Sequence, residues 1–136
     1  MNVYLLDTNV CIRILNGTHE GVIGRFSAES PATVRLCSVV KCELLYGARK
    51  INQLAQLINN LELFFAPMAS LPFDDRAAEH YGMIRADLAR QGSPIGGNDL
   101  QIAAIARVHD LTLVTHNIQE FSRVVGLRVE DWEATA

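Results

Sequence analysis

The chain has 136 residues, of which 49% are hydrophobic, and this is enough for one domain with its own core. Its apolar runs are far shorter than the ~18 residues of a membrane-spanning helix, and its N-terminal residues lack a signal-peptide pattern, so we expect a single cytoplasmic domain over residues 1–136 with no membrane partner. The net charge of −3 is weak evidence against a nucleic-acid substrate, although a bound divalent cation would reverse part of that charge.

Cysteine and histidine spacing argues against a thiol nucleophile or a zinc centre. The three cysteines lack CxxC spacing, and the four histidines form no HxH or HxxxH pair. We therefore expect Cys11, Cys37 and Cys42 to be reduced and buried.

Segments typical of strands and of helices alternate along the chain. In order, we predict a strand at residues 3–6, helices at 10–15 and 20–28, a strand at 34–39, helices at 40–50 and 52–61, a strand at 62–68, helices at 73–90 and 98–108, a strand at 111–115, and a further short strand within 124–132. This alternation favours an α/β fold with a mostly parallel sheet flanked by helices. The carboxyl ends of parallel strands gather at one edge, where ligands bind in such sheets.

The first predicted strand ends in the polar residues Asp7, Thr8 and Asn9. A carboxylate at the carboxyl end of a buried strand is well placed to bind a metal ion. Aspartate is also a good N-cap for the helix that follows, so Asp7 alone fits either role equally well.

Two further acids lie where helices are expected to begin. Ser38 is the expected N-cap of the helix at 40–50, which places Glu43 in or near its first turn. Asn98 is the expected N-cap after a glycine-rich loop, which makes Asp99 the first helical residue. The alternative for both acids is a purely electrostatic role at the positive end of a helix.

Another polar cluster follows the strand at 111–115. Thr115, Asn117 and Glu120 offer a hydroxyl, an amide and a carboxylate at the same kind of strand end. A surface turn is the alternative, and we favour it for His116 and Gln119.

Together, Asp7, Glu43 and Asp99 form a more specific pattern than any one of them does. Carboxylates in one crevice repel one another unless a cation neutralises them, and an all-oxygen ligand set suits Mg²⁺ or Mn²⁺. Such a site lowers the pKa of a bound water and stabilises charge that develops on a phosphoryl group, so hydrolysis of a phosphodiester is the reaction it fits best.

Five segments, in this order, resemble the PIN-domain family, and specifically the VapC-type toxins of bacterial toxin–antitoxin pairs. They are LLDTN at 5–9, CELLYGA at 42–48, PIGGNDLQIAA at 94–104, LVTHNIQEF at 113–121 and VVGLRVEDW at 124–132. The resemblance spans nearly the whole chain and implies a PIN-like three-layer α/β/α fold and a metal-dependent endoribonuclease that leaves a 5′-phosphate. It also implies structured RNA such as tRNA as the substrate, a VapB-like antitoxin that blocks the active site, and a homodimer.

The same resemblance assigns roles to individual residues. Asp7, Glu43 and Asp99 match the acidic metal-site residues of the family. Asn9 and Thr115 match positions that support these acids through hydrogen bonds.

One position departs from the fullest form of the family pattern. Many PIN domains supply a fourth acid after the last core strand, but here Asn117 stands close to that point and the nearest acid is Glu120. Either Glu120 fills the role, or the site binds one ion tightly and a second only with substrate.

Contacts with RNA and with protein partners are less well defined by the sequence. Tyr46 and Trp132 could stack on bases, but we expect packing in or around the core for both. The apolar stripes of the helices at 40–50 and 52–61 are expected to take up the antitoxin or a second copy. The candidates for phosphate contacts, each also typical of a solvated surface, are Arg13, Lys41, Arg49, Lys50, Arg85, Arg90 and Arg107.

Two other functions compete with a nuclease. A phosphatase with an aspartyl nucleophile needs a second acid two residues after the first, but that position is Asn9, and no suitably placed late lysine is evident. A non-catalytic scaffold would be favoured by the loss of one of the three acids, and all three are present.

Overall fold

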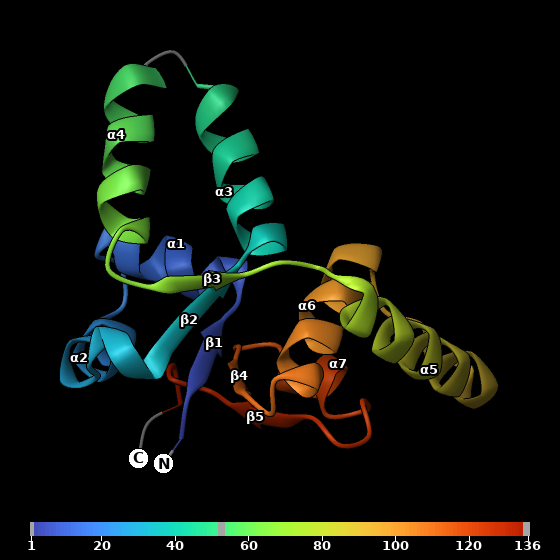
Figure 1. Ribbon diagram of the computed structural model, residues 1–136. Coiled ribbons are helices and arrows are strands. Elements are labelled where there is room, and N and C mark those ends of the chain that lie inside the picture. The colour runs from blue at the N-terminus through green and yellow to red at the C-terminus, as the bar shows by residue number, and fades with distance from the viewer. Residues whose placement is uncertain (1, 52–53, 135–136) are drawn as a thin grey trace.

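The structure is a computed structural model that describes residues 2–51 and 54–134. One parallel sheet has the strand order β3-β2-β1-β4-β5 (Figure 1). The central strands β1 and β4 are buried along their whole length, and their register pairs Leu6 with Val114, so both end at the same level. The prediction of a mostly parallel sheet is confirmed. The strands are β1 Tyr4–Leu6, β2 Val34–Cys37, β3 Ala69–Leu71, β4 Thr112–Val114 and β5 Arg128–Glu130.

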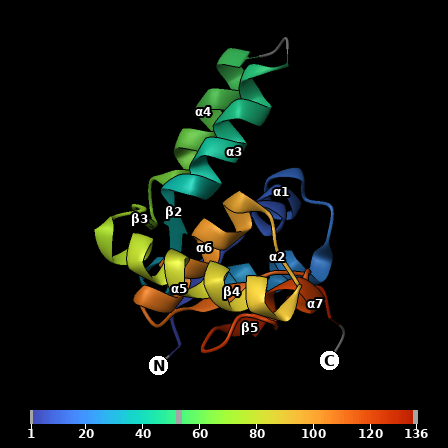
Figure 2. The ribbon, with the colours of Figure 1, turned by 90° about the vertical axis from the view of Figure 1, so that its right-hand side faces the viewer.

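Helices cover both faces of the sheet. Helices α1 and α2 lie on one side, and α5 and α6 pack together on the other (Figures 1 and 2). Asp7 and Asp74 cap the start of α1 and α5, and Gly17 and Gly92 end these helices with φ of 63° and 69°, a conformation that favours glycine. The helices are α1 Thr8–Asn16, α2 Glu20–Ala28, α3 Ser38–Arg49, α4 Leu54–Phe65, α5 Asp75–Gln91, α6 Gly97–Val108 and α7 Ile118–Phe121, with a short 3₁₀ turn at Pro31–Thr33.

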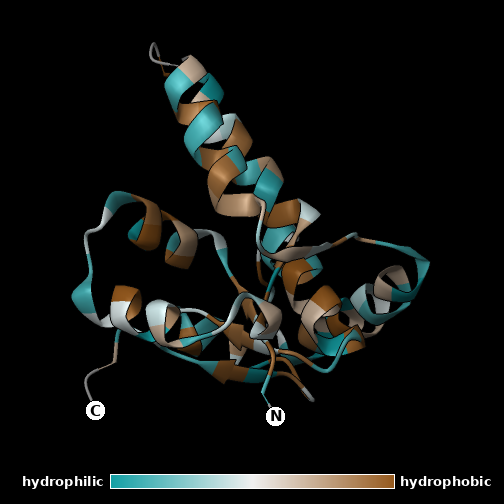
Figure 3. Ribbon diagram, turned by 60° about the vertical axis from the view of Figure 1, so that its left-hand side comes forward, coloured by the Kyte–Doolittle hydropathy of each residue, from teal (hydrophilic) through white to brown (hydrophobic). Residues whose placement is uncertain are grey.

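Helices α3 and α4 form a hairpin that projects beyond the carboxyl edge of the sheet (Figures 1 and 2). Hydrophobic residues concentrate on the strands, whereas hydrophobic and hydrophilic bands alternate along the hairpin (Figure 3). The hairpin therefore packs through one face and leaves the other exposed. No helix in the described ranges is long and apolar enough to cross a membrane.

The predicted strand at 62–68 is wrong. Helix α4 continues to Phe65, the chain turns, and β3 begins at Ala69. The partly buried Phe64 and Phe65 continue the helical spacing that begins at Leu57 and Leu61, so the segment has the period of a helix rather than that of a strand. The predicted start of this helix at Asn52 lies outside the described residues.

The predicted helix caps also need correction. Strand β2 ends at Cys37, which is the N-cap of α3 without a side-chain hydrogen bond, so Ser38 is already helical and Glu43 lies in the second turn rather than the first. Gly96 is the N-cap of α6 in place of Asn98, which makes Asp99 the third helical residue. Both acids therefore lie further inside their helices than predicted.

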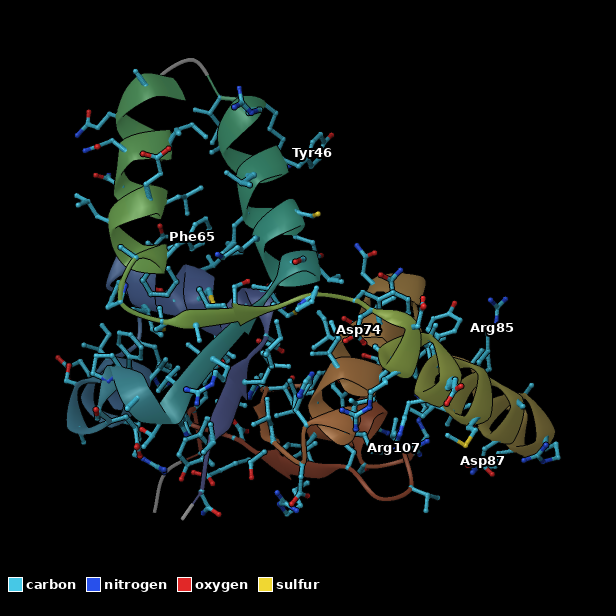
Figure 4. All side chains as sticks on the ribbon, viewed as in Figure 1. Tyr46, Phe65, Asp74, Arg85, Asp87 and Arg107 are labelled. Atoms are coloured by element: carbon cyan, nitrogen blue, oxygen red, sulfur yellow. The ribbon has the colours of Figure 1, made fainter. Side chains whose placement is uncertain are left out.

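Exposure was predicted correctly for most, but not all, of the singled-out side chains. Trp132 is buried as expected, with 2% exposed, as are Cys11 and Cys37. Cys42 is exposed, and so is Tyr46, which points away from α4 into solvent (Figure 4). Both lie on the outer face of α3, which no described element covers.

Candidate active site

Asp7 caps α1 and also carries a carboxylate to the carboxyl edge of the sheet. Its Oδ1 accepts a 2.9 Å hydrogen bond from the Val10 N–H, and only 8% of the residue is exposed. Burial raises the pKa of Asp7, and the charges of Glu43 and Glu133 raise it further, whereas hydrogen bonds from Thr115 and Val10 lower it. The role of Asp7 as a cap is confirmed, and the same carboxylate lies close enough to Glu43 to interact with its charge.

Glu43 projects from α3 and is oriented from α1. Its Oε1 accepts a 2.7 Å hydrogen bond from the Thr8 hydroxyl. The sequence prediction does not include Thr8 among the site residues, and its only signal is its place inside the LLDTN segment. Two consecutive residues, Asp7 and Thr8, thus supply one acid and the hydrogen-bond donor that orients another.

Asp99 is half-buried in the first turn of α6. Burial raises the pKa of Asp99 to about 7, together with the charge and a hydrogen bond of Glu120 and the charges of Glu43 and Asp7. Burial is the largest cause of this shift, and the contributions of Glu120, Glu43 and Asp7 place these three acids within interaction range of Asp99. The structure therefore brings together the three acids predicted from the sequence and adds Glu120 to them.

The loop after β4 connects Thr115, Asn117 and Glu120 into one chain of hydrogen bonds. The fully buried Thr115 hydroxyl accepts a 3.0 Å hydrogen bond from the Asn117 N–H. The Asn117 side-chain amide donates to the Glu120 carboxylate. Asn117 is the N-cap of the short helix α7, so Gln119, for which we favoured a surface turn, is helical, whereas His116 precedes the helix.

A polar cavity of about 440 Å³ lies beside Asp7. Asn9, Asn117, His116 and Asp131 line it with Asp7, so Asn9 faces the site from the first turn of α1. His116 Nδ1 lies 3.1 Å from the Asp131 carboxylate. This contact anchors His116, which we expected to be an ordinary turn residue.

The C-terminal segment reaches the site as well, and this was not predicted. Glu133 contributes to the raised pKa of Asp7, and it lies 3.7 Å from the Arg13 guanidinium. Trp132 holds the segment in place, because its ring packs edge-on against Tyr4 with 5.4 Å between ring centroids. Contacts between residues this far apart in the chain leave no local signal in the sequence.

Comparison with known proteins identifies the family. The PIN domain family model matches residues 4–127. The chain belongs to the PIN domain family. It is 42% identical over 129 residues to the tRNA(fMet)-specific endonuclease VapC of Shigella flexneri, and the aligned region covers 95% of this chain and 97% of that protein.

Solved structures agree with this PIN domain assignment. A chain of the DNA-bound VapBC structure from Salmonella typhimurium matches with a TM-score of 0.90 at 38% identity, covering 97% of this chain and 99% of that one. VapBC-1 from nontypeable Haemophilus influenzae matches with a TM-score of 0.86 at 33% identity, with the same shares of the two chains. The three-layer α/β/α fold expected from the resemblance is confirmed.

The donor set of this PIN domain fits a hard divalent cation. Asp7, Glu43, Asp99 and Glu120 offer only oxygen atoms, which Mg²⁺ and Mn²⁺ prefer. Burial raises the pKa values of Asp7 and Asp99 most, and repulsion from neighbouring acids raises them further; a bound cation would offset both effects. Within residues 2–51 and 54–134, no three acid, histidine or cysteine side chains already converge at metal-ligand spacing, so binding an ion would draw the carboxylates closer together.

Several of the basic residues considered for RNA contacts have partners within the PIN domain. Arg13 pairs with Glu133, and Arg90 pairs with Asp87 at 3.7 Å. The Arg107 guanidinium donates to His80 Nδ1 at 2.9 Å and to the Val125 carbonyl at 3.0 Å. These three arginines therefore have partners within the protein. In contrast, Lys50 lies over the Tyr46 ring and Arg85 over the Tyr81 ring, where both remain accessible.

Proposed function

We propose that this PIN domain is a metal-dependent endoribonuclease toxin that hydrolyses RNA phosphodiester bonds and is inhibited by a cognate VapB-like antitoxin. The observation that supports the catalytic role most directly is the raised pKa of Asp99, to which burial contributes most and three nearby acids, Glu120, Glu43 and Asp7, also contribute. Residues 1–136 form one domain in this proposal, and the protein acts in the cytoplasm, where its RNA substrate is.

Asp7, Glu43 and Asp99 are proposed as the metal ligands. A bound Mg²⁺ or Mn²⁺ would lower the pKa of a water molecule and stabilise the charge that develops on the scissile phosphate. Thr8 orients Glu43, and the Thr115 hydroxyl supports Asp7. Asn9 faces the cavity beside Asp7 and is available to orient water or phosphate there.

Glu120 is proposed as the fourth acid, in place of Asn117. Its carboxylate lies within hydrogen-bonding reach of Asp99, and the Asn117 amide donates to it. The amide nitrogen, which cannot bind a cation, holds this carboxylate in place. Asn117 therefore orients Glu120, and the fourth carboxylate comes from three residues further along the chain.

The substrate is proposed to be structured RNA, with tRNA(fMet) as the first candidate. Two relatives that are 42% and 40% identical to this chain are tRNA(fMet)-specific endonucleases.

The test is cleavage of a small-RNA pool and of tRNA(fMet), with Mg²⁺ or Mn²⁺ and with EDTA. Asp7→Asn is a sharper variant than Asp7→Ala, because asparagine keeps an N-cap oxygen for the Val10 N–H while removing the charge. We expect it to lose more than about 100-fold in kcat/KM. Asp74→Asn is the matched control, since Asp74 caps α5 by accepting a 3.0 Å hydrogen bond from the Ala77 N–H and lies outside the site.

Discrete fragments from wild type and Asp74→Asn, but not from Asp7→Asn or with EDTA, would support the nuclease. Absence of cleavage by folded wild-type protein that also fails to bind Mg²⁺ or Mn²⁺ would favour the non-catalytic scaffold. A phospho-enzyme formed from small phosphate esters would favour the phosphatase instead.

The antitoxin is proposed to bind a groove between α1 and the α3–α4 hairpin. The groove encloses about 450 Å³, its wall is largely apolar, and Glu43 lies at its margin, so a peptide bound there would reach the acids. Ile51 lines the groove with 53% of its surface exposed, whereas Leu63 on α4 is 67% exposed and lies outside it.

Ile51→Lys should therefore weaken binding of the antitoxin encoded by the neighbouring gene and leave RNA cleavage intact. Leu63→Lys adds the same charge to the same hairpin and should bind the antitoxin normally. Equal effects of the two variants would contradict the groove. Homodimer formation stays a prediction, and light scattering of wild-type protein tests it.

A further inference from the structure

A second cavity, of about 290 Å³, lies between α5 and the first turn of α6. Gly97 and Leu100 contribute to its wall, so the first turn of α6, which also carries Asp99, borders the cavity. The opposite wall is formed by α5, including Tyr81, Arg85 and Ala89. None of the residues assigned above to metal binding or antitoxin binding lines this cavity.

Tyr81 and Arg85 form an aromatic–cation pair in the cavity wall. The Arg85 guanidinium lies 5.9 Å from the centre of the Tyr81 ring and donates a 3.1 Å hydrogen bond to the Tyr81 hydroxyl. Phe73 contacts the Tyr81 ring edge-on, with 5.9 Å between ring centroids, and so fixes the orientation of the ring. The aromatic surface is therefore already ordered before a ligand binds.

Arg85 keeps most of its hydrogen-bonding capacity. Among the ion pairs of the described residues none involves Arg85, and a guanidinium has five N–H donors, of which the Tyr81 hydroxyl uses one. The side chain rises from α5 on the side toward which the α3–α4 hairpin projects (Figure 4). It is thus a positive charge in the cavity wall that is available to a ligand.

The charge of the protein makes this pair significant. A chain with a net charge of −3 and clustered carboxylates at its site cannot hold RNA through a general positive field. It needs local contacts, and single-stranded RNA is held by stacking of splayed bases on aromatic rings and by arginine contacts to phosphates. An ordered tyrosine and an arginine without an ion pair, in a cavity bordered by the helical turn that carries Asp99, supply both.

We propose that this cavity is a nucleobase subsite, in which a base next to the scissile phosphate stacks on Tyr81 while Arg85 binds an adjacent backbone phosphate. The inference rests on the proposed nuclease function and deepens it, because the subsite would contribute to the choice of the cleavage position. Tyr81 and Arg85 are specificity-determining residues here and take no part in the bond cleavage itself.

The test combines a variant with an altered substrate. An RNA stem-loop that contains the mapped cleavage position is made intact and with an abasic nucleotide at each position flanking the cut. With wild type, one abasic position should lower kcat/KM by about 5- to 100-fold. Tyr81→Ala should lower kcat/KM for the intact RNA by a similar factor and show no further loss at that abasic position, whereas Tyr81→Phe, which keeps the ring, should behave like wild type.

Arg85→Ala should raise KM and reduce the slope of log affinity against log salt by about one. Arg90→Ala is its matched control, because Arg90 lies on the same helix, pairs with Asp87 and does not line the cavity. An equal loss in both variants would mean that only the overall charge of α5 matters, and this would overturn the subsite.

A blocking variant keeps the proposal testable if Tyr81→Ala fails to fold. Ala89 lines the cavity and is exposed, so Ala89→Trp should obstruct it and lower kcat/KM, while Ala86→Trp, on an exposed position of α5 outside the cavity, should not. Thermal unfolding checks the fold of each variant. A changed oligomeric state of Ala89→Trp with normal cleavage would identify the cavity as a contact between copies and overturn the subsite.

The outcomes separate this inference from the function on which it rests. Metal-dependent cleavage that requires Asp7 but is unaffected by all the α5 variants would overturn the subsite alone. An abasic effect that persists undiminished in folded Tyr81→Ala would do the same. No cleavage by the wild-type protein would overturn the proposed function, and the subsite with it.

Discussion

Asp99→Asn should make the metal-free protein more stable at alkaline pH while it abolishes RNA cleavage. The pKa of Asp99 is raised from 3.8 to about 7, chiefly by burial and by Glu120. Between these two pH values the folded state binds more protons than the unfolded state, so the free energy of unfolding falls as the pH rises, and the full penalty is present above pH 7. Asparagine mimics the neutral form of the side chain and carries no penalty at any pH.

The size of the effect follows from the shift. About three pKa units correspond to at most ~4 kcal/mol, and because Asp99 is only half-buried, solvent screening reduces this to about 1–2 kcal/mol. In a domain of this size, that is a rise of roughly 3–8 °C in the melting temperature. The assay is thermal unfolding followed by circular dichroism in EDTA, at pH 5 and at pH 8.

Asp99→Asn should melt higher than wild type at pH 8, and the difference should shrink strongly at pH 5, where wild-type Asp99 is protonated. Asp75→Asn, which alters an exposed acid in the first turn of α5, is a control without this dependence. An Asp99→Asn protein that melts at or below the wild-type temperature at pH 8, or that gains equally at both pH values, would refute the reasoning.

Three further predictions follow from contacts at the site. Thr8→Val should lower kcat by about 10- to 100-fold, because it removes the 2.7 Å hydrogen bond to Glu43. Thr8→Ser, which keeps the hydroxyl, should have a kcat close to that of wild type. Normal turnover of Thr8→Val would show that Glu43 needs no such support. Mg²⁺ affinity, measured by calorimetry, should rise with pH by up to about tenfold per pH unit below pH 7 and level off above it, because Asp99 must lose its proton to bind the ion. A flat profile from pH 6 to 8 would count against Asp99 as a ligand. Trp132→Ala should reduce the free energy of unfolding by about 3–5 kcal/mol in urea titrations, since the ring is 2% exposed and packs against Tyr4, whereas a loss below about 1 kcal/mol would show that the C-terminal segment is not part of the core.

The fold could be predicted because the hydrophobic patterns that indicate its strands and helices span only a few residues each. Apolar runs such as Tyr4–Leu6 and the helical spacing of α5 are complete within a few residues, so strands and helices were recognised and their alternation indicated a parallel sheet. The strand predicted at 62–68 is wrong because a short apolar run such as Leu63, Phe64 and Phe65 fits a buried strand as well as a buried part of a helix. The helix is determined by the neighbouring residues of α4 and by packing against Phe26, whose ring centroid lies 5.9 Å from that of Phe64.

The candidate site was predictable only in part, for a physical reason. Asp7 and Asp99 stand at chain positions that a parallel topology must bring to one edge of the sheet, so their proximity could be inferred without a structure. The hydrogen bond of Thr8 to Glu43 joins residues 35 positions apart, and the effect of Glu133 on Asp7 depends on how the C-terminal segment packs. Side-chain directions of this kind are set by tertiary packing and leave no periodic trace.

The acids of this site make stability and function oppose each other. Asp7 and Asp99 both have raised pKa values, so in the absence of a cation part of the folding free energy is spent on holding carboxylates together. Hydrogen bonds from Thr8 to Glu43 and from Asn117 to Glu120 fix two of the carboxylates in place and limit how far they can move apart. A divalent cation would then stabilise the folded state and complete the proposed site through the same interactions. For this reason, Asp99→Asn should raise the melting temperature of the metal-free protein and at the same time lower RNA cleavage.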